Sequence, residues 1–376
     1  MSSVTLLAQT PGPTPLTPLQ RQAHAARAAD KLDEAIALYV RALKAQPRRK
    51  EGWWFPGTLS YEQDRYLDGR NAFRSLLALD QRFGPAFSLL GLCEFQLREY
   101  EQALLHLRRG NDMDPGDNEE LRRVARFHEA MLHAKFEQFE MAHDVTLKYV
   151  LQKEPTPRTL LLPGLIMLRL PFLPEEAPAG KRELIGKTGR AAFYAASDNV
   201  AAAQREYQEL VTLYGHQPGV NYAHGLFLLR GDSDAAIAAL KRELDLTPGH
   251  VTAHLLLAFE YLKRNEPAAG LPYAEQAVRL APELFAGDNA LGRLFVDTGQ
   301  AERAIQALEK GVTLAPTSPE MHFALSRAYA KAGRAKDATR ARAEFTRLEK
   351  QRAAQQARLA EQAQARGGAT DGKPQP

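Results

Sequence analysis

Apolar segments along the chain end at regularly spaced prolines. Pro248, Pro282 and Pro316 follow one another at a constant interval of about 34 residues, and each comes just after a segment that ends in apolar residues. Pro47 and Pro115 are separated by twice this interval. Proline stops a helix because it has no N–H to donate and its ring collides with the preceding turn. The pattern therefore predicts helices that end once in every period.

Small and large residues keep the same period. Two helices approach closely only where their side chains are small, so one small residue per helix and per period predicts a stack of helical hairpins. We expect the large residues to fill the space between neighbouring hairpins. The small residues form two series, Gly57, Gly91, Ala191, Gly225, Ala258, Gly292, Ser326 and Ala35, Gly69, Ala103, Ala236, Gly270, Ala304, Ala338; the large residues are Tyr39, Phe73, Leu107, Tyr261, Phe295 and Tyr329.

This arrangement resembles the tetratricopeptide repeat (TPR), a helix–turn–helix of about 34 residues with small residues at two crossings and a closing proline. Trp53 stands at the tryptophan place of that repeat, and Phe87, His254 and His322 stand there in other repeats. The resemblance covers roughly residues 16–350 and is to multi-repeat TPR proteins of the bacterial type. It implies an all-α solenoid of about nine to ten TPR-like hairpins.

Two stretches depart from the repeat. Residues 118–154 read as a hairpin with weak repeat residues, and 155–190 contain six of the 23 prolines, among them Pro171 and Pro174. A hairpin cannot continue through these two prolines, so we expect one helix, an extended loop and a second helix beginning near Gly180. The sequence thus predicts an irregular joint, near which two arms of the solenoid meet.

The expected organisation has five parts. We expect the first to be unfolded because it is rich in proline, and a polar helix from Lys336 to Arg366 to cap the last hairpin. The residues from Gly367 onward are expected to be disordered. The parts are 1–15, a disordered Pro-rich leader; 16–154, an N-terminal TPR array; 155–190, the irregular joint; 191–350, a C-terminal TPR array; and 351–376, a polar helical tail ending in disorder.

The distribution of charge argues against a nucleic-acid partner. The chain has a net charge of +4, but the segment from Pro319 onward holds 12 Lys or Arg against 6 Asp or Glu, which leaves positions 1–318 at −2. A nucleic-acid binder carries its basic surface on the folded body. We therefore expect other proteins or peptide segments as partners; the sequence leaves the oligomeric state open.

The apolar segments are too short to cross a membrane. Even Leu160–Leu170 is interrupted by Pro163, Gly164 and Arg169, so no membrane span is expected. Met1–Thr10 has no basic residue and too little apolar sequence for a secretory signal. The sequence as written favours a cytoplasmic protein. Leu6–Thr10 also resembles the end of an export signal, so an upstream start would favour a periplasmic or exported protein.

Motifs that suggest chemistry have closer structural explanations. Gly180 and Gly186 are separated by five residues, not the four of a phosphate-binding loop, and no strand precedes them. Cys93 is the only cysteine, which excludes a disulfide within the chain and a multi-cysteine metal site, and we expect it to be a buried core thiol.

The histidines do not form a metal site. His128 and His133 lie five apart, which turns them roughly 140° from each other on a helix. His250 and His254 lie four apart but lack an acidic residue at helical spacing, and His254 fills a packing place of the repeat. No nucleophile, base and orienting group come together in the sequence. We therefore expect no metal, no cofactor and no enzymatic activity.

The resemblance implies that the first helix of each hairpin lines a concave face. Positions four and then three residues apart on these helices point inward together. Most of them are apolar or aromatic, so this face suits the apolar side of a helix or an extended segment; alternatively, curvature buries much of it between adjacent helices. The candidate groove residues are Trp54, Tyr61, Leu92, Phe95, Tyr222, Leu226, Leu229, Leu255, Phe259, Leu262, Asn289, Arg293 and Arg327.

Two arginines at one end of this groove suggest an acidic feature in the partner. Arg293 and Arg327 lie one repeat apart and would stand side by side; alternatively, they pair with neighbours such as Asp297. The groove has Trp54 and Phe259 where TPR domains that hold C-terminal carboxylates need polar donors. The sequence therefore predicts a protein-binding scaffold. Alternatives are an accessory protein of a cell-envelope assembly or secretion system and, third, an enzyme with its site at 155–190.

Overall fold

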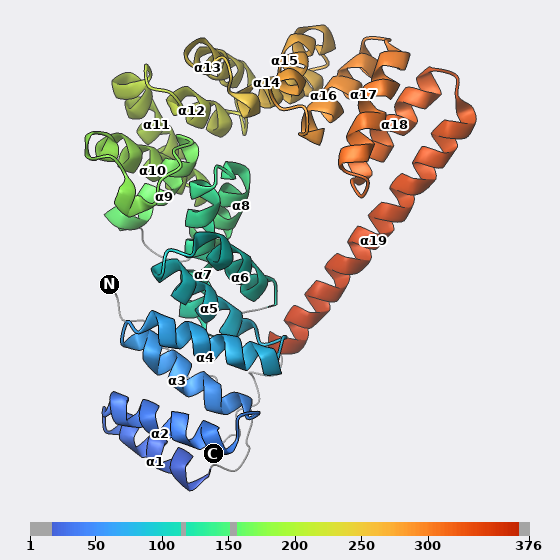
Figure 1. The fold of residues 1–376 in the computed structure, drawn as a ribbon. Coiled ribbons are helices and arrows are strands. Elements are labelled where there is room, and N and C mark those ends of the chain that lie inside the picture. The colour runs from blue at the N-terminus through green and yellow to red at the C-terminus, as the bar shows by residue number, and fades with distance from the viewer. Residues whose placement is uncertain (1–16, 114–117, 151–155, 368–376) are drawn as a thin grey trace, which may run out of the picture. The chain divides into compact units, whose positions relative to one another are not determined.

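The computed structural model describes residues 17–113, 118–150 and 156–367. Every regular element in these residues is a helix, and they contain no strand (Figure 1). The expected all-α solenoid of helical hairpins is confirmed. The chain forms two compact units, Met1–Tyr214 and Gly215–Pro376, which are described separately as unit 1 and unit 2.

Unit 1 contains five hairpins, with one additional helix before the last of them. The two helices of each hairpin pack against each other. In the first four hairpins, the second helix of one hairpin also contacts the first helix of the next, as α2 contacts α3, α4 contacts α5 and α6 contacts α7. The helices are α1 (Pro18–Ala28), α2 (Leu32–Ala45), α3 (Lys50–Glu62), α4 (Tyr66–Leu79), α5 (Gly84–Gln96), α6 (Tyr100–Asp112), α7 (Glu119–Lys135), α8 (Phe139–Val150), the additional α9 (Pro157–Met167), the 3-10 helices η1 (Pro174–Glu176) and η2 (Ala179–Lys181), α10 (Arg182–Ala196) and α11 (Val200–Tyr214).

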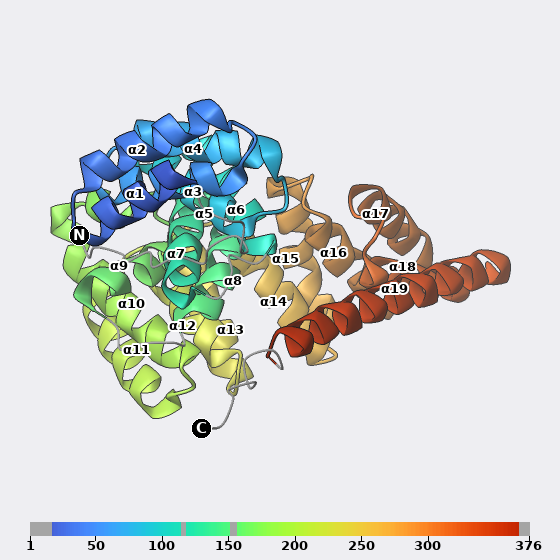
Figure 2. The same ribbon diagram turned by 90° about the horizontal axis from the view of Figure 1, so that it is seen from below.

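Unit 2 contains four hairpins, which brings the hairpins of the described residues to nine, within the expected number. The views from two directions show each helix beside its hairpin partner (Figure 2). The helices are α12 (Val220–Leu228), α13 (Ser233–Leu246), α14 (Val251–Lys263), α15 (Pro267–Leu280), α16 (Phe285–Asp297), α17 (Ala301–Leu314), α18 (Pro319–Lys331) and α19 (Ala335–Gly367).

The turn inside most hairpins contains one residue in the left-handed conformation. At Asp64 φ is 59°, and the next N–H, of Arg65, donates to the carbonyl of Ser60 at 2.8 Å. This bond satisfies a carbonyl that the end of the helix would otherwise leave without a donor. The same conformation recurs at Asp30, Arg98, Glu137, Arg169, Asp198, Asn265, Gly299 and Gly333.

The two helices of a hairpin touch where the sequence places small residues. A Cβ added to Gly91 on α5 would lie 2.9 Å from the backbone nitrogen of Leu107 on α6. One added to Gly292 on α16 would lie 2.3 Å from Cγ of Leu308 on α17. These distances are shorter than van der Waals contact, so the helices can pack this closely only because the side chains are absent.

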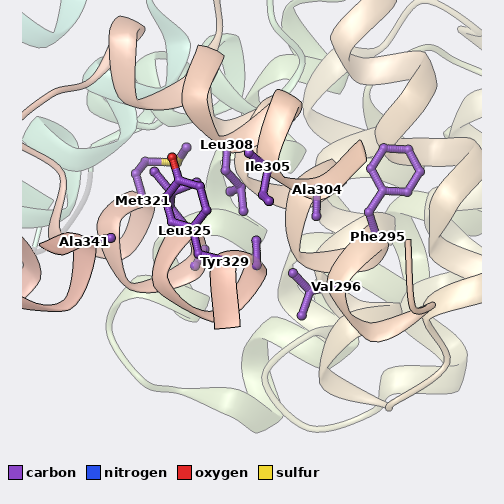
Figure 3. Packing of buried hydrophobic residues seen from close by; sticks show 11 residues of the cluster. Phe295, Val296, Ala304, Ile305, Leu308, Met321, Leu325, Tyr329 and Ala341 are labelled. Atoms are coloured by element: carbon purple, nitrogen blue, oxygen red, sulfur yellow. The ribbon is translucent and has the colours of Figure 1, made fainter. Parts of the chain in front are cut away.

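Large side chains fill the space between hairpins, as expected. Tyr39 on α2 is buried, and its ring stacks on that of Phe55, on the first helix of the next hairpin, with 5.2 Å between ring centroids. In unit 2, Tyr329 and Phe295 belong to one buried cluster that joins α16, α17, α18 and α19 (Figure 3). Met321 and Leu308 of this cluster are completely or almost completely buried. Each hairpin is therefore stabilised by its neighbours as well as by the packing of its own two helices.

The segment 155–190 contains two helices that cross with almost no space between their backbones. A Cβ on Gly164 of α9 would lie 1.9 Å from the carbonyl oxygen of Ile185, and one on Gly189 of α10 would lie 1.8 Å from that of Leu160. Between the helices the chain passes through Pro171 and the two short 3-10 helices. The expected meeting of two arms at this segment stays a prediction. The two compact units divide further along the chain, after Tyr214.

The last helix, α19, is the long polar helix expected to cap the array. Ala341 and Leu348 in its first half are buried, and Arg352 donates to Glu320 of α18 at 2.8 Å. The leader at 1–15, expected to be unfolded, and Pro115 and Pro155 lie outside the described residues. Disorder was expected from Gly367 onward; Gly367 is the last residue of α19, and 368–376 lie outside the described residues. None of the helices in the described ranges is long and apolar enough to span a membrane.

Candidate functional site

In unit 1, most of the expected groove residues lie in the core. The ring of Trp54 packs edge-on against Phe73, with centroids 5.9 Å apart, and Phe95 meets the ring of His128 at 4.6 Å. Leu92 is only 2% exposed. The first helices α3, α5 and α7 contact one another in turn, so side chains on this side of unit 1 pack between neighbouring helices.

Tyr61 is the partly exposed member of the set in unit 1. Its ring lies edge-on to that of Tyr66, with centroids 5.6 Å apart. Burial raises the pKa of the Tyr61 hydroxyl far above its ordinary value of 10.0. The candidate residues of unit 1 therefore offer a partner little more than the accessible part of this one neutral ring.

In unit 2, four apolar residues at the expected groove positions remain partly exposed. Leu226 on α12 and Leu229, the residue that follows this helix, pack on one side against a core that contains Tyr222. Phe259 and Leu262 project from α14 and pack on one side against a different core cluster. We call these four residues the apolar stripe, namely Leu226, Leu229, Phe259 and Leu262. Their outer sides are accessible to another molecule.

Three further candidates in unit 2 are buried below this stripe. Tyr222 packs its ring on His250, with centroids 4.4 Å apart, and Leu255 is 7% exposed. Asn289 on α16 is also buried, and its amide oxygen accepts no hydrogen bond from a described residue. These side chains support the helices that carry the stripe and contribute little accessible surface.

The two arginines at the end of the set have different surroundings. The guanidinium of Arg327 on α18 donates to Asp297 of α16 at 2.9 Å, so this arginine already has a carboxylate partner. The guanidinium carbon of Arg293 lies 5.9 Å from the ring centroid of Phe259, a cation–π contact. Arg293 has no ion pair among the described residues and lies beside the apolar stripe.

The histidines have structural contacts. Nδ1 of His250 accepts a hydrogen bond from the N–H of Ala253 at 3.1 Å and so caps the start of α14. His128 bonds the carbonyl of Val124, whereas His133 faces Gln138, so these two rings do not converge. No group of three or more potential metal ligands occurs in the residues that the structure describes.

A cavity of about 790 Å³ lies at α9 and α10 in unit 1. Its volume is typical of a site for a small molecule. The sequence pointed to this segment as the place to look for a pocket because of its irregular prolines, but gave no reason to single out its arginines. The cavity is lined by Pro157, Arg158, Leu160, Leu161, Pro174, Glu175, Arg182, Gly186, Arg190 and Tyr194.

The family model for the tetratricopeptide repeat matches the chain in five overlapping places. They are residues 21–66, 57–118, 226–285, 255–319 and 289–367. Together they cover more than half of the chain and include the end of α12 and all of α13 to α19, whereas α7 to α11 lie outside them. No curated protein matches the chain.

Solved structures of MamA are similar to part of the chain. The structure named "MamA 41-end from Desulfovibrio magneticus RS-1" is 23% identical, with a TM-score of 0.42, and the match covers 45% of this chain and 96% of that one. The structure named "MamA RS-1 ArsTM double mutant" is 23% identical, with a TM-score of 0.42 and coverage of 46% and 97%. A further "Crystal structure of MamA" is 19% identical, with a TM-score of 0.41 and coverage of 43% and 96%.

Proposed function

Because the chain belongs to the tetratricopeptide-repeat family, whose members bind other proteins, we propose that its unit 2 binds an apolar segment of a partner protein along the first helices α12, α14 and α16. The protein is an interaction scaffold built from tandem helical hairpins. The observation that carries the finer proposal is the apolar stripe. Accessible apolar side chains grouped on one surface are typical of interaction sites.

The stripe and Arg293 together indicate the chemistry of the partner. Leu226, Phe259 and Arg293 lie at equivalent positions of three successive repeats, and Arg293 contacts the ring of Phe259. Leucine and phenylalanine favour apolar side chains, and an arginine without an ion pair favours a carboxylate. The expected partner segment therefore has apolar residues and, at one end of them, an Asp or Glu.

The spacing of the helices sets the length of that segment. Axes of packed helices lie about 8–10 Å apart, and α14 contacts α16, so a segment that extends from α12 across α14 to α16 spans at least roughly 20 Å. An extended chain covers this distance with about six residues. A short linear segment of the partner is sufficient, and a folded partner domain is not required.

A photo-reactive amino acid placed at residue 226 or 259 tests the position of the site. The control carries the same amino acid at residue 246, since Leu246 is also an exposed leucine, 42% accessible, but lies on the second helix α13. We expect one partner to crosslink at 226 and 259 and not at 246. Equal crosslinking at 246 would contradict binding along the first helices.

Affinity measurements with the identified partner test the chemistry. Leu226→Ala should weaken binding by roughly five-fold, because a partly buried leucine contributes about 1 kcal/mol more than alanine. Leu246→Ala is the matched control and should have no effect. Arg293→Gln should weaken binding and reduce its salt dependence, whereas Arg303→Gln on the second helix α17 should leave both unchanged. Wild-type affinity in both Leu226→Ala and Arg293→Gln would show that the stripe is not the site.

A further inference from the structure

Three glycines lie on α9 and α10, and helix packing requires only two of them. Gly164 and Gly189 allow the two backbones to touch, as described above. Gly186 on α10 differs, because a Cβ built there meets no atom within 4 Å, and its φ is not in the left-handed region. Glycine inside a helix costs about 1 kcal/mol relative to alanine. Neither packing nor backbone conformation accounts for Gly186.

Gly186 lines the cavity between these helices, so its missing side chain keeps that space open. The inner wall is apolar, since Leu160 and Leu161 of α9 and Pro174 of η1 are buried there. Tyr194, about two helical turns further along α10, is partly exposed and adds an aromatic ring with a hydroxyl group. An apolar wall of this kind binds the apolar part of a ligand.

The remaining lining residues are mostly cationic. Arg158, Arg182 and Arg190 carry three positive charges against the single carboxylate of Glu175, and all four residues are exposed. This excess favours a ligand with a negative charge. Because arginine presents several N–H donors in a planar fork, it suits the oxygens of a carboxylate or a phosphate.

The three arginines are not equally available. Arg182 uses Nε and Nη2 to donate to the carbonyls of Ala177 and Glu175, both at 3.3 Å. Arg190 lies 4.0 Å from Glu206, too far for a hydrogen bond. Arg158 has no hydrogen bond or ion pair with another described residue. Arg158 and Arg190 therefore have donors to offer a ligand, and Arg182 holds the segment that carries the lining residues Pro174 and Glu175.

We propose that this cavity binds a small amphipathic anion, with its apolar body against Leu160, Leu161 and Pro174 and its acidic group against Arg158 and Arg190. The acidic group is a carboxylate or a phosphate monoester, which present similar oxygens to a guanidinium. An uncharged apolar molecule would gain nothing from the two guanidiniums, whose donors would stay hydrogen-bonded to water. A wholly polar anion would leave the apolar wall uncovered.

A fluorescent fatty acid, dansyl-undecanoic acid, tests the proposal on the full-length chain. Its emission rises and shifts to the blue when the dansyl group leaves water. We expect saturable binding to the wild-type protein and displacement by decanoate, by decyl phosphate, or by both, with the more effective competitor identifying the acidic group. 1-Decanol has the same chain without the charge and should compete at least ten-fold less well. Equal competition by 1-decanol, or no displacement by either anion, would overturn the proposal.

Substitutions locate the binding site in the cavity. Gly186→Leu places a side chain in the open space and should lower affinity for the probe at least ten-fold while the melting temperature is retained. Gly180→Leu is the matched control, because a Cβ there also meets nothing within 4 Å, but Gly180 does not line the cavity. Wild-type binding by Gly186→Leu, or equal losses in both variants, would contradict the proposed location.

The arginines provide an independent test that does not depend on filling the cavity. The double variant Arg158→Gln/Arg190→Gln should bind the anions roughly ten-fold more weakly and 1-decanol as well as the wild type does. Arg205→Gln, an exposed arginine on α11 outside the cavity, should bind like the wild type. These side chains are exposed, so the variants should keep the wild-type fold. Circular dichroism of each variant checks this. Unchanged anion affinity in the double variant would exclude the proposed contacts.

Discussion

Nε2 of His254 lies 2.9 Å from the carbonyl oxygen of Pro248, the proline that follows the preceding helix, six residues earlier. His322 makes the same contact with Pro316, also at 2.9 Å, and the indole N–H of Trp53 donates to Pro47 at 3.0 Å. The tryptophan place of the repeat thus links the start of a first helix to the connection that precedes it. Either an indole or an imidazole can make this link, because each ring has an N–H that reaches the proline carbonyl.

We predict that His254→Phe lowers the free energy of unfolding by about 1 kcal/mol, because the ring volume is retained and the hydrogen bond to Pro248 is lost. Phe87 occupies the same place in another repeat, so a phenyl ring fits there. Urea unfolding of the variant measures the effect. Stability equal to that of the wild type would mean that the hydrogen bond contributes nothing.

Two alanine substitutions three residues apart on α10 should have opposite effects. Gly189→Ala places a Cβ against the carbonyl of Leu160 and should destabilise the protein by about 3 kcal/mol, because the backbone there cannot move without separating α9 from α10. Gly186→Ala meets no neighbouring atom and should stabilise it by up to about 1 kcal/mol. Thermal melts of the two variants provide the comparison. A loss of stability in both would show that Gly186 is also required for packing.

Two phenylalanines of unit 2 differ in exposure, so their replacement by alanine should cost different amounts of stability. Phe295 is 3% exposed in the cluster of Figure 3, so Phe295→Ala should cost about 3–5 kcal/mol. Phe259 in the apolar stripe is only partly buried, and Phe259→Ala should cost about 1–2 kcal/mol because part of its surface is already in water. Equal losses, measured by urea unfolding, would place Phe259 in the core and remove it from the proposed binding surface.

The protein should lose stability as the pH falls from 6.5 toward 4. Burial lowers the pKa of His128 from its ordinary value of 6.5 to about 4, and the positive charge of Arg158 also disfavours protonation, although the carbonyl of Val124 opposes this shift. Between these pH values the unfolded chain binds more protons than the folded one, so acid favours unfolding.

His128→Phe tests this assignment, since it keeps a ring beside Phe95 and cannot titrate. Between pH 7 and pH 5 the wild type should lose at most about 2 kcal/mol more stability than the variant does. His24, His143 and His224 also have lowered pKa values and are present in both proteins, so their contribution cancels. An identical pH dependence in the two proteins would exclude His128 as the cause.

Deletion of residues 351–376 should leave the melting temperature nearly unchanged. The deleted residues 351–358 are exposed, and the pair between Arg352 and Glu320 is a surface ion pair that contributes about 0–1 kcal/mol. The deletion removes four basic and two acidic residues, a change of −2 in net charge. By contrast, a deletion that begins at Leu348, which is buried, should lower the melting temperature clearly.

The repeated part of the fold could be predicted because its causes are local and periodic. Prolines end helices, and small residues such as Gly91 and Gly292 permit the crossings, wherever the rest of the chain lies. The contact of Tyr39 with the next hairpin follows from the same period. The hydrogen bonds of His254 and His322 could not be predicted, because they depend on the direction of a ring relative to a carbonyl.

The candidate site was less predictable, because periodicity gives a side chain's direction and not its exposure. Leu92 and Leu226 occupy equivalent places on first helices, yet Leu92 is buried and Leu226 is partly exposed. Leu92 lies on α5, which contacts the first helices α3 and α7, whereas Leu226 lies near the end of α12 and packs on one side against the cluster that contains Tyr222. The cavity at α9 and α10 was hidden for another reason. Its wall combines residues 157–161, 174–175 and 182–194, and their meeting depends on the loop between the helices.

The length of α19 has a mechanical consequence. Beyond Leu348, its last buried residue among those whose side chains the structure describes, the helix continues to Gly367. At 1.5 Å per residue this part is roughly 28 Å long. A helix of this length bends little, so it acts as a lever attached to the last hairpin. A rotation of that hairpin by about 10° would displace the far end by about 5 Å. Small adjustments within the array are thus converted into much larger movements at the tip of this helix.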